Sequence, residues 1–102
     1  MTENECYEAF ARAVKSICPP NFEQARLVAE MDDGWSRKTY QYKSGGTWSA
    51  GQSVASALDF DVDDALLELH AHMQQDRTPN WTGCTFTLEP DGKFSIEFIR
   101  PN

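Results

Sequence analysis

Residues 81–98 read WTGCTFTLEPDGKFSIEF, and this stretch decides the fold of the chain. Apolar and polar residues alternate on both sides of Pro90-Asp91-Gly92, a sequence typical of a tight turn between two antiparallel strands. The apolar positions that share one face of this predicted hairpin are Cys84, Phe86, Leu88, Phe94, Ile96 and Phe98. A sheet with one apolar face needs a second layer to cover it, so we expect helices elsewhere in the chain.

The first predicted helix runs from about residue 2 to residue 18. Apolar residues recur there at spacings of three and four, namely Tyr7, Phe10, Val14 and Ile17. Such spacing places them on one face of a helix. Thr2 and Glu5 match a capping box, which indicates the start of the helix, and Pro19-Pro20 predicts its end.

The second predicted helix begins at Val62, with Asp61 as its N-cap. Its apolar face contains Val62, Ala65, Leu66, Leu69 and Met73. We expect Trp81, which opens the last hairpin, to pack against this helix. The aromatic side chain therefore has a structural role in this interpretation.

Two strands precede the second helix, over residues 25–33 and 35–44, with a turn at Asp33-Gly34. The following segment, residues 47–60, fits either a short third strand or an ordered loop. The predicted order is helix, two strands, this segment, helix, two strands. The 102 residues are therefore expected to form a single α+β domain, 1–102, in which two helices pack on one face of an antiparallel sheet of four or five strands.

The charge of the chain restricts the kind of partner that it can bind. Sixteen acidic residues against nine basic ones give a net charge of −7. Nucleic acids and anionic membranes repel such a surface, so we predict neither as a direct partner. A basic protein fits better, because opposite charges accelerate its association.

The N-terminus and the cysteines predict a cytoplasmic protein. MTENECYEAF has neither the basic nor the apolar region of a signal peptide. The chain has an odd number of cysteines, Cys6, Cys18 and Cys84, and no CxxC spacing. Both features favour reduced thiols. We expect these thiols to act as small apolar side chains.

The sequence contains no recognisable catalytic or metal-binding constellation. His70 and His72 would point about 200° apart on a helix and so could not grip one metal ion. Asp59, Asp61 and Asp63 stand at positions one, three and five of a calcium loop, but position six is an acid instead of Gly and position twelve is His70. We therefore predict no catalytic residues, no metal and no cofactor.

Several short motifs in the last third of the chain resemble one known family. They are Trp81, Phe86-Thr87-Leu88, Asp91-Gly92-Lys93-Phe94 and Ile96-Glu97-Phe98. This pattern is similar to the YezG-like family of small bacterial immunity proteins. The resemblance implies that the chain neutralises a cognate toxin, most often a nuclease, delivered in interbacterial competition such as contact-dependent inhibition. It implies a mechanism of occlusion, without any enzymatic reaction.

A nuclease must hold phosphates in a basic groove, so a carboxylate-rich surface is a natural competitor for that groove. Tryptophans are enriched at the energetic centres of interfaces. The predicted toxin-binding residues are Asp32, Asp33, Trp35, Trp48, Asp59, Asp61, Asp63 and Asp64. The alternative is a small ligand-binding or regulatory domain that acts through a pocket between helices and sheet, or through a homo-oligomer interface at a sheet edge. The oligomeric state is left open.

Overall fold

The described residues form two helices and five strands in the predicted order, with a short third strand where the sequence allowed either a strand or a loop. The computed structural model describes residues 2–32, 35–50, 54–75 and 81–99, without the side chains of 31, 32, 35, 36 and 73–75. The elements are α1 (Glu3–Lys15), β1 (Gln24–Asp32), β2 (Trp35–Ser44), β3 (Thr47–Ala50), α2 (Ser56–Gln75), β4 (Gly83–Leu88) and β5 (Phe94–Ile99). The α+β fold is confirmed, and residues 47–50 form the third strand.

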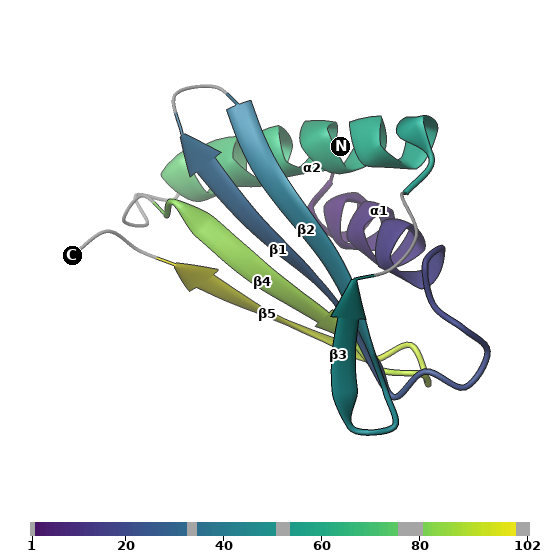
Figure 1. Cartoon of the computed structure of the whole chain (residues 1–102). Helices are drawn as coiled ribbons and strands as arrows, with labels where there is room; N and C mark the ends of the chain where they lie inside the picture. The colour runs from purple at the N-terminus through teal and green to yellow at the C-terminus, as the bar shows by residue number, and fades with distance from the viewer. Residues whose placement is uncertain (1, 33–34, 51–53, 76–80, 100–102) are drawn as a thin grey trace.

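The five strands make one antiparallel sheet in the order β3-β2-β1-β4-β5. Strand β1 lies at its centre, and the short β3 and the C-terminal β5 lie at its edges. Both helices pack on the same face of the sheet and against each other, and no described helix or strand covers the opposite face (Figure 1).

The core lies between the helices and the three central strands. Leu27 of β1 stands opposite Phe86 of β4, and both side chains are completely buried. The ring of Phe10 from α1 meets Phe86 edge-on, with 5.5 Å between ring centroids. The second helix contributes the buried side chains Val62, Ala65, Leu66 and Leu69. The apolar face of β4 is therefore part of the core, and Ile96 and Phe98 of β5 pack against it while partly buried.

The last hairpin closes through the predicted turn. The amide of Gly92 donates to the carbonyl of Glu89 (3.0 Å), and the amide of Glu89 donates to the carbonyl of Lys93 (2.8 Å). Gly92 has a φ of 93°, a conformation that side chains with a Cβ rarely adopt. Pro90 and Asp91 occupy the central positions of the turn, which suits the fixed φ of proline.

Trp81 packs against the second helix, as predicted. Its side chain is 2% exposed, and its ring meets His70 of α2 edge-on at 5.0 Å between centroids. On its other side it contacts Phe98 of β5, at 5.2 Å. The indole therefore joins the far end of α2 to the edge of the sheet.

The boundaries of both helices differ from the prediction. The second helix begins at Ser56, so the expected start at Val62 is wrong and Asp61 is not its N-cap. The helix can start this early because Ser56 and Ala57 are compatible with helical structure. Leu58 extends the apolar face of the helix by one turn. Predicted Met73 lies outside the described side chains. The first helix keeps its predicted capping box but ends at Lys15, before Cys18, because prolines follow.

Candidate functional site

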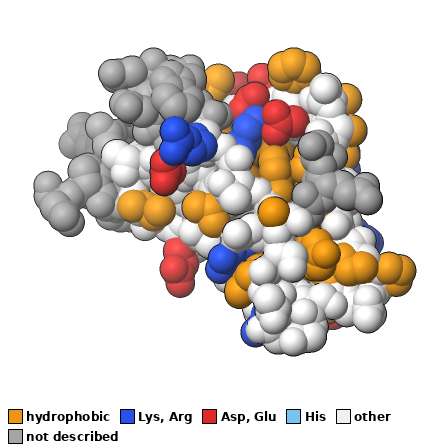
Figure 2. All heavy atoms as spheres, in the orientation of Figure 1, with side chains coloured by type: hydrophobic (Ala, Val, Ile, Leu, Met, Phe, Trp, Pro, Cys, Tyr) orange, Lys and Arg blue, Asp and Glu red, His pale blue; other side chains and the backbone are white. Residues whose placement is uncertain are grey.

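A network of polar side chains joins the start of α2 to β2. Lys38 and Tyr40 lie on the helix-covered face of β2, because they stand opposite Ala29 and Leu27, whose side chains are buried. The first turns of α2 pass over them. Figure 2 shows acidic side chains next to a basic one where α2 lies beside β2.

Lys38 bonds two carboxylates of α2 at once. Its Nζ lies 2.9 Å from Oδ1 of Asp59 and 2.5 Å from Oδ1 of Asp63. It also donates to the main-chain carbonyl of Asp59 (3.2 Å). The lysine side chain is 9% exposed, whereas each carboxylate side chain is 37% exposed. A nearly buried ammonium thus has three oxygen acceptors, which offsets the cost of removing it from water.

Tyr40 completes the network by donating from its hydroxyl to Oδ1 of Asp59 (2.8 Å). Partial burial raises the pKa of Asp59, but the hydrogen bonds from Lys38 and Tyr40 outweigh it, and the pKa lies below its usual value. Two effects raise the pKa of Tyr40. Burial is the larger, and the hydrogen bond to the Asp59 carboxylate is the smaller. Asp59 is therefore ionised and Tyr40 protonated at neutral pH.

The opposite side of α2 faces solvent and combines apolar with acidic side chains. Phe60 is 66% exposed and Leu67 is 53% exposed. Three carboxylates are also exposed around them, those of Asp61, Asp64 and Glu68. We call these five residues the outer α2 face. A helix with buried side chains on one side does not need large apolar side chains on the other for packing.

The uncovered face of the sheet has a different character. The guanidinium of Arg26 lies 4.0 Å from the centre of the Trp48 ring, a cation–π contact between β1 and β3. The Nε of Arg26 also donates to Oε1 of Gln41 (2.6 Å). Over the strands, red, blue and orange side chains are scattered among white ones (Figure 2). This face therefore has mixed charge.

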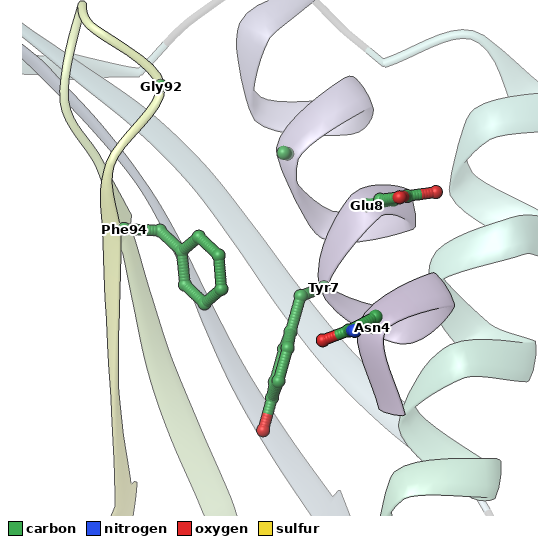
Figure 3. A pocket seen from close by; sticks show the side chains of 6 residues that line it. Asn4, Tyr7, Glu8, Gly92 and Phe94 are labelled. Atoms are coloured by element: carbon green, nitrogen blue, oxygen red, sulfur yellow. The ribbon is translucent and has the colours of Figure 1, made fainter. Parts of the chain in front are cut away.

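A shallow cavity of about 250 Å³ lies between α1 and the β4–β5 turn. The rings of Tyr7 and Phe94 border it from the two sides, with their centroids 5.2 Å apart, while Glu8 points away from Phe94 (Figure 3). The Tyr7 hydroxyl donates to Oε1 of Glu3 (2.7 Å). Burial and this bond raise the pKa of Tyr7, so the phenol keeps its proton at neutral pH.

Among the described side chains, the residues predicted to bind a toxin do not all lie on one face of the molecule. The structure brings Asp59 and Asp63 together on Lys38 and leaves Asp61 and Asp64 exposed on the same helix. Trp48 lies on the uncovered side of the sheet, with Arg26 over it. The last three predicted residues, Asp32, Asp33 and Trp35, have side chains that lie outside the described residues, as does the predicted turn at Asp33-Gly34.

The structure adds residues that the sequence did not single out as site candidates. Lys38 and Tyr40 contact the acidic side chains of α2 only because β2 and α2 pack together, so no local sequence pattern predicts their role.

The positions of Phe60 and Leu67, in contrast, could have been recognised from their spacing in the sequence. They are seven residues apart on α2 and so lie on one line along the helix, away from Val62.

Within the described parts of the chain, no group of three or more His, Cys, Asp or Glu side chains is arranged to hold a metal ion. None of the described helices combines the length and apolar character that crossing a membrane requires. The three cysteines are free thiols, with Cys6 and Cys84 buried.

Comparison with known proteins identifies the family. The chain is 22% identical over 107 aligned positions to the type VII secretion system protein EsaG of Staphylococcus aureus (strain NCTC 8325 / PS 47). That alignment covers 93% of this chain and 66% of the length of EsaG. Residues 4–101, which include all five strands, the whole of α2 and α1 from its second residue onward, match the family described as immunity protein YezG-like. The chain therefore belongs to the YezG-like family of immunity proteins.

Proposed function

We propose that this chain neutralises a toxic nuclease by binding to it and covering its substrate groove. Membership of an immunity-protein family supports the role in toxin neutralisation. The mechanism requires binding only, so the chain needs no catalytic residue, metal or cofactor. The toxin acts in competition between bacteria, and the immunity protein protects the cytoplasm of the cell that makes it.

The acidity of α2 is the observation that supports a nuclease as the target. This helix contains five carboxylates between Asp59 and Glu68, and no Lys or Arg in its whole length. A nuclease holds phosphates with basic side chains, and a carboxylate surface competes for the same side chains. The field of such a surface also accelerates association with a basic protein.

The proposed contact residues differ in what they offer a partner. Asp61 and Asp64 are exposed and accessible to direct ion pairs. Asp59 and Asp63 bond to Lys38 and contribute mainly to the field. The remaining proposed residues, Asp32, Asp33, Trp35 and Trp48, belong to the strands and the β1–β2 connection. An interface centred on α2 agrees best with the distribution of accessible charge.

The similarity to EsaG supports a toxin that leaves its producing cell through a type VII secretion system. EsaG carries that system in its name, and the matched region covers most of the present chain. Sister cells that receive such a toxin need a neutralising partner inside the cell, which is the role proposed here.

A ligand-binding role is the second candidate, and the cavity at Tyr7 and Phe94 is the observation that favours it. Its volume of about 250 Å³ is below the range of roughly 300–1,000 Å³ that is usual for small-molecule sites. The cavity is also shallow and open to solvent. We therefore rank this role below toxin binding.

The test is co-expression in a bacterial host with the toxin-like product of the adjacent upstream reading frame. Growth should cease with that product alone and recover when this chain is co-expressed. The Phe86→Asp variant places a charge in the core and should prevent folding. It tests whether rescue requires the folded chain, and it should not restore growth. Failure of the wild-type chain to restore growth, together with turnover of a metabolite by the purified chain, would overturn the proposal.

A further inference from the structure

We propose that the outer α2 face is the surface that docks on the toxin, with Phe60 and Leu67 as its apolar anchors and a basic face of the toxin as its occupant. This inference rests on the proposed function and adds to it the location of the interface. It also moves the interface away from the pair Asp59 and Asp63, which the protein uses internally.

Two large apolar side chains of the outer α2 face are exposed to solvent. Phe60 and Leu67 are two helical turns apart and lie on the side of α2 opposite the buried Leu69. They are 66% and 53% exposed. Neither side chain contributes to the core. Their apolar surface is still exposed to water in the free protein, so burying it in a complex would stabilise that complex.

Exposed carboxylates surround these two apolar side chains. Asp64 lies between Phe60 and Leu67 on the same side of the helix, at spacings of four and three. Asp61 and Glu68 lie on the neighbouring line, again seven residues apart. Apolar anchors surrounded by an exposed charged rim are the usual anatomy of a protein–protein interface.

The negative charge of the outer α2 face favours a basic partner. Helix α2 contains no Lys or Arg, so no lysine or arginine of their own helix pairs with the exposed carboxylates. A basic protein surface would pair with them, whereas a nucleic acid would be repelled. A second copy of this chain is also a poor occupant, because docking by the same face would place carboxylates against carboxylates.

The uncovered sheet face lacks this selectivity. It presents basic side chains such as Arg37 and Lys43 together with the acidic side chains of Glu30 and Glu97. Among the described side chains of this face, the exposed large apolar one is Ile99, which is 46% exposed. A basic groove would meet both attraction and repulsion there, so the outer α2 face is the better complement.

The anchors are tested by titration calorimetry with a catalytically inactivated domain of the toxin encoded next to this chain. The double variant Phe60→Ala/Leu67→Ala should raise the Kd at least about thirty-fold, as expected for two central anchors. The matched control is Ile99→Ala, which removes an exposed apolar side chain from the sheet and should change the Kd less than about threefold. Alanine favours helix, so α2 should persist in the double variant, and circular dichroism verifies this.

The rim is tested by stopped-flow association at low and high salt. Asp61→Lys/Asp64→Lys should slow association about tenfold at low salt and weaken its salt dependence. Glu30→Lys/Glu97→Lys changes the net charge by the same amount on the opposite face and should have a much smaller effect.

The outcomes separate the two proposals. If the wild-type chain does not bind the toxin domain, the proposed function fails. If it binds, but the α2 variants behave like their matched controls, the docking surface lies elsewhere and the present inference is wrong while toxin binding stands. Sedimentation equilibrium tests the remaining occupant: a wild-type dimer that Phe60→Ala/Leu67→Ala dissociates would assign the face to a second copy of the chain and overturn the inference.

Discussion

The ammonium group of Lys38 in β2 lies 2.9 Å from the carboxylate of Asp59 in α2, and the lysine side chain is 9% exposed. This ion pair crosses from the sheet to the helix layer and also engages Asp63. It divides the carboxylates of α2 into two groups with different tasks. One group holds the helix on the sheet, and the other faces solvent, where a partner can reach it.

The ion pair should contribute measurably to stability. Replacing Lys38 with Met leaves two neighbouring carboxylates without their cation, so we expect the free energy of unfolding to fall by about 1–2 kcal/mol. Lys93→Met is the control, because Lys93 lies 3.9 Å from Asp91 with both side chains exposed, and such pairs contribute little. Urea denaturation measures both, and equal effects would contradict a structural role for Lys38.

The same network should make stability depend on acidic pH. The pKa of Asp59 is lower in the folded protein than in the unfolded chain, so the folded state binds this proton less tightly. Its contribution is complete above the unfolded pKa of about 3.9 and is lost as the pH falls through the lower folded value. Asp59→Asn should flatten this part of the stability profile. Parallel profiles for the wild type and Asp59→Asn would contradict the assignment.

Gly83 should not tolerate a side chain. A Cβ at this position would lie 2.6 Å from the carbonyl oxygen of Ala29 and 3.3 Å from Cδ1 of Ile99. The first contact is with backbone, which cannot move without disturbing the pairing of β1 with β4. We expect Gly83→Ala to lower the free energy of unfolding by about 1–3 kcal/mol. Exposed Ser95→Ala, on β5, should stay within about 0.5 kcal/mol of the wild type in the same denaturation assay.

The cysteines should be slow to react in the native protein. Burial raises the pKa of the Cys84 thiol to about 12, so only about one molecule in ten thousand carries the thiolate at pH 8. Burial also raises the pKa of Cys6 and of the less enclosed Cys18. Labelling with a thiol-specific disulfide reagent at pH 8 should modify Cys18 first, and all three rapidly in denaturant. Fast native labelling of Cys84 would contradict its place in the core.

Alternation and periodicity predict the elements because burial acts on each residue locally. The pattern around Pro90 and Gly92 predicts the hairpin, its turn and the face that is covered. It does not predict how deeply each residue is buried. Phe94 is on the expected face but is 46% exposed, because β5 is an edge strand and the helices cover the centre of the sheet.

For the candidate site, the sequence shows which residues are acidic but not which of their side chains a partner can reach. The acidic run of α2 is visible in the sequence, and so is the absence of Lys and Arg from that helix. Which carboxylates remain accessible depends on Lys38, more than twenty residues earlier in the chain. The early start of α2 at Ser56 also matters, because it places Asp61 inside the helix, on its solvent side, instead of at its end.

The α+β order of elements, the covered face of the closing hairpin and an acidic character that favours a basic partner all follow from local spacing or from composition. That Asp59 and Asp63 bond inward while Phe60 and Leu67 face outward follows from the packing of α2 on the sheet. That distinction depends on which strand packs beneath α2, since a carboxylate beside a buried ammonium is held by the fold and one beside solvent is available to a partner.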